Sequence, residues 1–419
     1  MTASLYIHVP FCAGVCDYCD FYSIPVGAGD RRMDAYIDRL LAGAECLLRD
    51  SGLRRIPTAY IGGGTPSVLG AARFKRLLKG LGGLMAALDE GPREFTVEAN
   101  PESADRAFLE ACREGGVNRL SLGVQSFHEA SRRAVHRVGG AALLPERLKG
   151  AREIFGSAFS ADIISGLPLQ GESFLLRDLE RLLEYEPGHV SLYSLTVEPG
   201  TPLAESSRAA ARAAGALPEG AAPLPGADEA DRLWLCGRGF LEKAGYEQYE
   251  VSNFARPGKR SAHTIRYWRM ENWLALGPAA SATIISDSAP AGGGRRYTVL
   301  PDLEAWLKGP PDAPPLIEES PDAETLMKET FLMGFRYIEG PDPALFERRF
   351  GVTIENAIPE TLARWRERGL AGAGRAALNR EGLLLLNPFL LDVFEELETS
   401  APLRQTPIQA DPKACGNTG

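Results

Sequence analysis

The sequence lacks a hydrophobic run that could cross a membrane, since a spanning helix needs about 20 consecutive apolar residues. The nearest candidate, Leu383–Leu391, is interrupted by Asn387 and Pro388. The N-terminus also lacks a basic segment followed by an apolar one, so no secretory signal peptide is visible. We therefore expect a cytoplasmic protein with no transmembrane segment, for which peripheral contact with a membrane stays open.

An excess of positive charge is also missing. The chain has 46 Lys and Arg against 55 Asp and Glu, a net charge of −9. Proteins that coat nucleic acid carry the opposite balance, so we expect no nucleic-acid partner. The length of 419 residues predicts two or three domains.

Cysteine is scarce, and its placement is uneven. The count of seven is odd and no export signal is visible, which argues against a disulfide framework. Three of the seven lie within eight residues, in the spacing C-x3-C-x2-C: Cys12, Cys16 and Cys19. Of the others, Cys46, Cys112 and Cys236 are expected to be small core residues, and Cys415 lies near the C-terminus.

Strand-like and helical segments alternate through the first half of the chain. Such alternation predicts an α/β fold with a parallel sheet and right-handed crossovers. The pattern alone does not separate an open doubly wound sheet from a partial or full barrel, but both bind ligands at the C-terminal ends of their strands. The expected strands are Ser4–Val9, Thr58–Ile61, Glu94–Glu98, Arg119–Val124, Phe159–Ile164 and Val190–Leu195.

The second half is more varied. Residues 204–230 are rich in Ala, Pro and Gly and are expected to form a loose insertion, followed by a helix at Asp231–Ala244. Three helices, a strand at Leu383–Asn387 and a last helix at Leu390–Glu398 indicate a small, mainly helical, winged-helix-like domain. We expect a partial-barrel core, a region that completes the barrel, a Pro-rich linker, the helical domain and a disordered tail at residues 1–200, 201–308, 309–322, 323–398 and 399–419.

The cysteine cluster follows the first expected strand directly, so a loop at that strand's C-terminal end can wrap three thiolates around one inorganic group. A structural zinc site needs four ligands, and it would have to recruit the fourth from a distant part of the chain. A [4Fe–4S] cluster held by three thiolates would instead keep one iron open for a substrate or cofactor.

The segment Tyr6–Cys12, continuing through Cys16, Tyr18 and Cys19, resembles the radical S-adenosylmethionine (SAM) superfamily and, within it, the oxygen-independent coproporphyrinogen III oxidase family. The resemblance extends over nearly the whole chain. It implies an incomplete (β/α)6 barrel followed by a smaller helical domain. It also implies a [4Fe–4S] cluster on the three cysteines, SAM as a cofactor, and a reductant such as a flavodoxin or ferredoxin.

Several strand-end residues match SAM-contact positions of this family. The turn Gly62–Ser67 matches the motif that receives the amino group of SAM, and glycine there permits close backbone approach. Glu98 ends the third strand, where a carboxylate could bind an ammonium or ribose hydroxyls. The full set that the resemblance implies for SAM is Tyr6, Tyr18, Gly63, Gly64, Thr65, Glu98, Gln125, Arg137, Asp162 and Thr196.

Two features distinguish branches of the family. Coproporphyrinogen oxidases carry a fourth Cys two positions after the third, where this chain has Phe21, and an N-terminal extension before the first strand. The segment His263–Trp268 resembles the H-N-x-x-Y-W motif of the HemW-type heme chaperones, with Thr264 in place of Asn. A neutral imidazole is a standard axial heme ligand, so this resemblance implies that His263 binds heme.

The leading hypothesis is therefore a heme chaperone that keeps a SAM-liganded [4Fe–4S] site and passes heme to an unknown acceptor protein. The main alternative is an oxygen-independent coproporphyrinogen III oxidase, a dehydrogenase that decarboxylates propionates by radical chemistry in porphyrin biosynthesis. A third is a radical SAM enzyme with another substrate.

Overall fold

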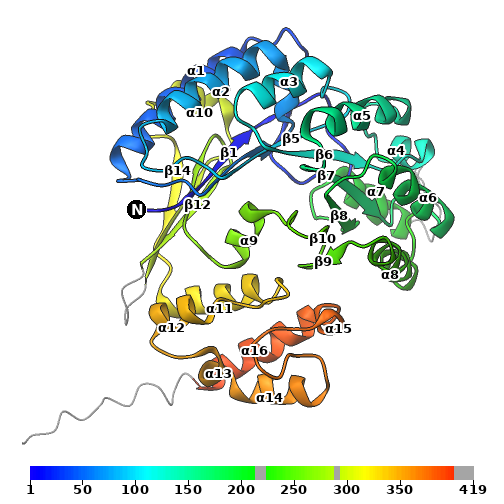
Figure 1. The fold of residues 1–419 in the computed structure, drawn as a ribbon, viewed down its shortest axis with the longest axis vertical. Coiled ribbons are helices and arrows are strands. Elements are labelled where there is room, and N and C mark those ends of the chain that lie inside the picture. Colours follow the sequence, from blue (N-terminus) through cyan, green and yellow to red (C-terminus); the bar gives the residue numbers. More distant parts are fainter. Residues whose placement is uncertain (213–222, 287–292, 401–419) are drawn as a thin grey trace, which may run out of the picture.

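The computed structural model describes residues 1–212, 223–286 and 293–400. The main sheet has 12 strands, which come from residues between Ser4 and Glu319. Their order is β14-β13-β12-β11-β1-β4-β5-β6-β7-β8-β10-β9. Figure 1 shows the sheet curving, with helices covering its outer face and a second group of helices below it. The two edge strands, β14 and β9, do not pair with each other, so the barrel is incomplete.

The centre of the sheet is parallel and comes from the first half of the chain. Its strands are β1 (Ser4–Val9), β4 (Thr58–Gly63), β5 (Glu94–Ala99), β6 (Arg119–Gln125), β7 (Phe159–Ser165) and β8 (His189–Ser194). All six predicted strands are confirmed. Each is buried along most of its length, as expected for parallel strands covered on both faces.

Helices connect these strands across the outer face (Figure 1): α1 (Arg32–Asp50), α2 (Gly70–Met85), α3 (Arg106–Glu114), α4 (Glu129–Ala134), α5 (Leu144–Phe155) and α6 (Glu172–Leu183), with short 3-10 helices η1 (Pro66–Leu69) and η2 (Ala141–Leu143). In α1, Met33, Ile37, Leu40 and Ala44 are buried at the spacing of one helical face. This apolar face is what holds the helix on the sheet.

Strands from the middle of the chain extend the sheet at both edges. On one side, β11 (Trp273–Leu276) pairs with β1 in parallel, followed by antiparallel β12 (Ser281–Ile285), β13 (Gly294–Val299) and β14 (Leu316–Glu319). On the other, β10 (Asn253–Ala255) and β9 (Glu247–Gln248) follow β8. A separate small sheet joins β2 (Phe11–Cys12) and β3 (Ile24–Pro25).

The expectation of a loose insertion at 204–230 is wrong for much of that segment. Helix α7 occupies Pro202–Arg212, and α8 (Ala227–Lys243) begins earlier than predicted. Alanine favours helix even where no clear apolar stripe marks one. Residues 213–222 lie outside the described residues. Two further helices of this region are α9 (Ala262–Trp268) and α10 (Leu303–Lys308).

The C-terminal region is mainly helical, as predicted. It contains α11 (Ala323–Gly334), α12 (Pro343–Phe350), α13 (Ile354–Ala357), α14 (Pro359–Glu367), α15 (Arg380–Leu383) and α16 (Leu386–Ser400). The strand predicted at Leu383–Asn387 is wrong, because these residues belong to α15, α16 and the turn between them. Asn379 caps α15 by accepting from the backbone N–H groups of Glu381 (3.1 Å) and Gly382 (2.9 Å).

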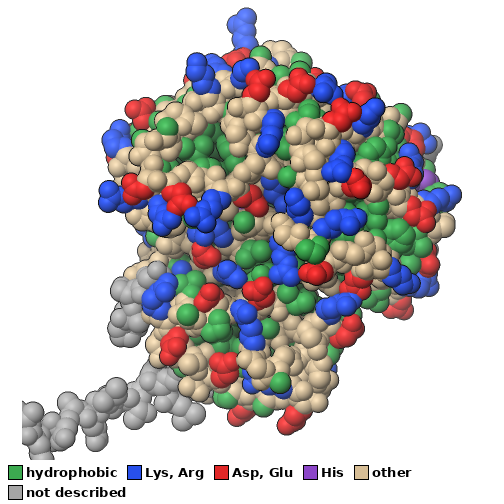
Figure 2. Space-filling model, in the orientation of Figure 1, with side chains coloured by type: hydrophobic (Ala, Val, Ile, Leu, Met, Phe, Trp, Pro, Cys, Tyr) green, Lys and Arg blue, Asp and Glu red, His purple; other side chains and the backbone are tan. Residues whose placement is uncertain are grey.

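This helical region has its own apolar core, which includes Phe331, Phe335, Phe346, Trp365 and Phe389. The predicted boundaries between domains stay a prediction, and the tail after residue 400 lies outside the described residues. Among the described helices, none combines the length and apolar character that a membrane span requires. Figure 2 shows acidic and basic side chains interspersed over the face in view.

Candidate functional site

A cavity of about 390 Å³ lies at the C-terminal ends of the parallel strands. The cysteine loop forms one wall, and the ends of β4, β5, β6, β7 and β8 form the others. Of the residues that the sequence implicates, the cavity is lined by Cys12, Cys16, Tyr18, Cys19, Gly63, Gly64, Thr65, Glu98, Gln125, Arg137, Asp162 and Thr196. Residues up to 184 positions apart, from 12 to 196, thus meet at one mouth.

The three thiols share this cavity but sit in different surroundings. Cys12 and Cys16 are buried, whereas Cys19 is half-buried. The Cys12 sulfur lies 3.2 Å from Thr65 Oγ1, and Arg137 Nη1 donates to the Cys16 sulfur at 3.6 Å. Among the described residues, no three Cys, His, Asp or Glu side chains converge closely enough to hold a single metal ion. The three thiols line the cavity without converging on one point.

Burial keeps the thiols of Cys12 and Cys19 protonated in the absence of a metal. It raises the pKa of Cys12, and it raises the pKa of Cys19 to about 11. A metal that binds here must therefore displace protons, so that loading becomes more favourable as pH rises. The positive charge of the Arg137 guanidinium partly opposes the rise in the pKa of Cys12.

The glycine turn after β4 packs tightly against the end of β1. Gly64 N–H donates to Val9 O at 2.8 Å and Thr65 N–H to Phe11 O at 2.6 Å. A Cβ on Gly64 would lie 2.6 Å from Phe11 O, so only glycine fits. The backbone N–H groups of Gly64 and Thr65 are therefore already engaged within the protein.

Two enclosed carboxyl groups face the cavity. Glu98 Oε1 accepts from Tyr60 OH at 2.5 Å, and Oε2 accepts from Gly63 N–H at 3.1 Å. Burial raises the pKa of Glu98 to about 7, although the hydrogen bond from Tyr60 opposes the shift. Burial also raises the pKa of Asp162 to about 6, partly offset by hydrogen bonds from Ser191 and Ser121.

The raised pKa of Glu98 predicts a pH-dependent stability. The folded protein holds a proton on Glu98 more tightly than the unfolded chain does, so stability falls as pH rises from about 4.5 to about 7. Between about pH 5 and about pH 8, cluster-free wild type should lose roughly 2–3 kcal/mol more unfolding free energy than Glu98→Gln. Urea unfolding at both pH values measures this. Parallel pH profiles for the two proteins would contradict it.

Two further polar side chains at the mouth have unpaired buried atoms. Gln125 ends β6 with φ +65°, at a shift in its register with β7. Within the part of the chain that the structure describes, Gln125 Oε1 and Arg137 Nε are buried without a hydrogen-bond partner. Since buried polar atoms are almost always paired, these two fit a ligand that supplies both a donor and an acceptor. The amino-acid end of SAM has both.

Asn100 is a further cavity residue that was not predicted from the sequence. It follows β5, lines the cavity, donates to Thr65 Oγ1 at 2.8 Å and accepts from Arg137 Nη2 at 2.7 Å. It thereby joins the glycine turn to Arg137. Its position, directly after β5 and two residues after Glu98, is the sequence feature that could have identified it. Tyr6, in contrast, does not line the cavity. Its hydroxyl contacts His8 Nδ1 at 3.0 Å, deeper in the barrel.

His263 lies at the opposite end of the barrel from the cysteines. It belongs to α9, and its Nδ1 is 2.8 Å from the hydroxyl of Thr58, the first residue of β4. Its Nε2 is 3.1 Å from Tyr267 OH. The side chain is only 2% exposed, and burial lowers its pKa to about 3. The imidazole is therefore neutral, enclosed and engaged at both nitrogens.

Glu94 holds the start of α9 in place. This first residue of β5 accepts from the backbone N–H groups of Ala262 (2.9 Å) and His263 (2.8 Å) and from Ser261 Oγ (3.4 Å). A carboxylate favours a helix N-terminus. The hydroxyl of Thr264, at the position where Asn is usual, contacts Ser261 Oγ at 3.0 Å.

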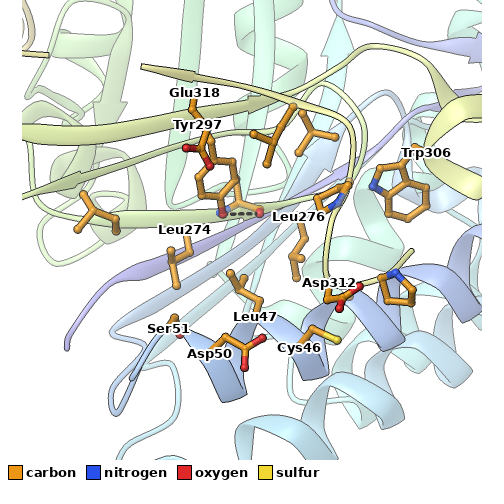
Figure 3. A pocket seen from close by; sticks show the side chains of 18 of the residues that line it. Cys46, Leu47, Asp50, Ser51, Leu274, Leu276, Tyr297, Trp306, Asp312 and Glu318 are labelled. Carbon is orange, nitrogen blue, oxygen red and sulfur yellow. Dashed lines mark hydrogen bonds between the residues drawn. The ribbon is translucent and has the colours of Figure 1, made fainter. Parts of the chain in front are cut away.

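A second cavity, of about 460 Å³, lies on the outer face of the sheet. Figure 3 shows Cys46 and Leu47 of α1 on one side and Leu274, Leu276 and Tyr297 on the other. It shares no lining residue with the cysteine cavity.

Comparison with known proteins gives consistent similarities. The sequence profile of the Radical SAM superfamily matches residues 6–191. The chain is 37% identical over 309 residues to "Radical S-adenosyl methionine domain-containing protein 1, mitochondrial" of Bos taurus, covering 73% of this chain and 66% of that protein. It is 32% identical over 360 residues to "Heme chaperone HemW" of Lactococcus lactis, covering 86% of this chain and 88% of that protein.

Among solved structures, coproporphyrinogen III oxidase (HemN) from Escherichia coli, described as a radical SAM enzyme, is similar with a TM-score of 0.73 at 22% identity. The match covers 94% of this chain and 90% of that chain. At this identity the likeness shows the fold, and it confirms the predicted fold class.

Proposed function

Since the chain belongs to the HemW heme chaperone family of the radical SAM superfamily, we propose that it binds heme as cargo and delivers it to acceptor proteins. The radical SAM domain implies a [4Fe–4S] cluster and SAM. When bound, this pair supplies one-electron chemistry at the cavity. The reductant is proposed to be a flavodoxin or ferredoxin.

The residues around the cysteine cavity fit both groups. Cys12, Cys16 and Cys19 would hold the cluster. Gln125 and Arg137, with their unpaired buried atoms, would take the carboxylate and amino end of SAM. Glu98 of β5 and Asp162 of β7, which both line the cavity, would accept from its hydroxyl or ammonium groups. These residues bind and orient the cofactor.

The observation that carries the chaperone proposal is the position of α9. This helix presents His263, Tyr267 and Trp268 between the barrel and the C-terminal helices, where Tyr337 and Ile338 pack with Trp268. An imidazole beside aromatic rings is a suitable place for a porphyrin. A heme site here would be separate from the cysteine cavity, which none of these three residues lines.

His263 can reach heme iron only after α9 moves. Both ring nitrogens are engaged and the side chain is closed off from solvent. Heme uptake would exchange the contact of one ring nitrogen, to Thr58 or to Tyr267, for a bond to iron. Thr264 does not contact the imidazole, so its effect on heme affinity would act through the N-terminal cap of α9.

The alternative, a coproporphyrinogen III oxidase, is supported by the fold it shares with the Escherichia coli enzyme. Phe21, which stands where the oxidases carry their fourth Cys, argues against this alternative. Phe21 lines the mouth of the cavity and is 65% exposed. An exposed phenyl ring there cannot supply the thiol that the oxidases carry.

A paired assay separates the two functions. Anaerobically reconstituted protein should bind heme, seen as a shift of the Soret band, and should show no decarboxylation of coproporphyrinogen III with SAM and a reductant. Transfer of the bound heme to an apo-cytochrome would then test delivery. Clear porphyrinogen turnover without heme binding would replace the chaperone proposal with the oxidase.

A further inference from the structure

A line of side chains crosses the barrel from the cysteine cavity, the proposed SAM site, to His263. At its centre is Tyr60, in the middle of β4. Its hydroxyl donates to Glu98 Oε1 at 2.5 Å, and its ring stacks on the His263 ring, with centroids 5.0 Å apart and planes 25° from parallel. On another side it stacks on Tyr6 at 6.2 Å. One residue thus contacts both a proposed SAM ligand and the proposed heme ligand.

The departure of His263 has an energetic cost that depends on Tyr60. When the imidazole leaves, it loses its stacking partner and opens a void beside β4. The cost of such a void depends on how far its neighbours relax into it. A Tyr60 that is free to turn can fill part of the space, whereas a Tyr60 bonded to Glu98 cannot.

The strength of that bond depends on what occupies the cavity. Without a ligand, Glu98 is enclosed and holds a proton readily, which weakens it as an acceptor. A ligand that brings donor groups to Glu98 favours the carboxylate, and hydrogen bonds to a carboxylate are roughly twice as strong as those between neutral groups. SAM has such donors in its ammonium and ribose hydroxyl groups.

We propose that Tyr60 is a positioning residue that couples the SAM site to α9. With SAM on Glu98, Tyr60 is held and His263 stays closed, so SAM lowers the affinity for heme. By reciprocity, heme lowers the affinity for SAM by the same factor. SAM would then act as a signal for heme release. This inference rests on the proposed heme-binding function and on His263 as its ligand.

The test is a heme titration of cluster-loaded protein, followed by the Soret band, with and without saturating SAM. No reductant is added, so SAM stays intact. We expect SAM to weaken heme binding by wild type at least about fivefold. In Tyr60→Phe, which keeps the ring and loses the hydroxyl, heme still binds and the SAM effect disappears.

The matched control is Tyr246→Phe. Tyr246 is a buried tyrosine whose hydroxyl donates to Pro187 O at 2.5 Å and contacts neither site. It should keep the full SAM effect. Iron content and the melting temperature check that each variant folds, and equilibrium dialysis with labelled SAM checks that each still binds it.

The outcomes separate the two proposals. A wild type that binds heme equally with and without SAM overturns the coupling and leaves the chaperone function intact. An undiminished SAM effect in Tyr60→Phe overturns the role of Tyr60. If wild type binds no heme at all, the function itself fails. If Tyr60→Phe does not fold, SAM dialysis of the wild type with and without heme must show the same factor in reverse, and its absence overturns the coupling.

Discussion

Replacing Cys12, Cys16 or Cys19 by Ala should reduce the iron of anaerobically reconstituted protein from about four atoms per chain to less than about one. The physical reason is that three thiolates hold three of the four irons, so that loss of one leaves a corner open to solvent and release. All three sulfurs border the same cavity, and the chain brings no fourth Cys to it among the lining residues. Iron and sulfide analysis with the visible absorbance of the cluster measures the effect.

The control for this series is Cys46→Ala. Cys46 is a half-buried free thiol in α1 that lines the outer cavity, away from the cluster loop. It should bind the wild-type amount of iron. Retention of a full cluster in any of the three loop variants, or a stoichiometric zinc ion with no iron after reconstitution, would refute the assignment.

The second large effect is expected at His263. His263→Ala should weaken heme binding by at least about a hundredfold, or ~3 kcal/mol, because the axial ligand is lost. Titration followed by the Soret band measures this. The neutral state of the buried imidazole suits it as a ligand, since protonation would compete with iron.

His189→Ala provides the matched control. His189 is also a buried histidine, held between Ser160 Oγ at 2.6 Å and Tyr249 OH at 2.7 Å. Its removal should cost similar stability and change heme affinity far less than His263→Ala does, because His189 reaches α9 through Tyr249 OH, which accepts from Ser261 N–H at 3.2 Å. Equal heme binding by wild type and His263→Ala would discard His263 as the ligand. Equal losses in both variants would point to general destabilisation.

The parallel core could be predicted because its signal is strong. Strands such as β6 and β7 carry closely spaced apolar residues, among them Leu120, Leu122 and Ile163, and polar residues lie at or near their C-terminal ends. The family resemblance singled out Glu98, Gln125 and Asp162, and the order of their strands placed them at one mouth. The family resemblance added which ligand each residue would meet.

The errors have specific causes. The leucine run before Asn387 has no alternation to separate strand from helix, and it is divided between the end of α15, a turn and the start of α16. No local pattern shows that the backbone N–H groups of Gly64 and Thr65 donate to Val9 and Phe11, which lie far away in the sequence. The enclosure of His263 depends on Thr58, which is 205 residues away, and no local pattern reports such a contact.

Strand β5 fixes the spacing between the two ends of the barrel. Glu94, which caps α9, and Glu98, which faces the SAM cavity, are four residues apart on it, or about 13 Å at the rise of a parallel strand. Ladders to β4 and β6 on either side lock its register. The backbone therefore cannot slide to carry a change from one end to the other. The distance between Glu94 and Glu98 cannot change without breaking the pairing of β5 with both neighbouring strands. A change at one end of the barrel can therefore reach the other end through rotation of side chains.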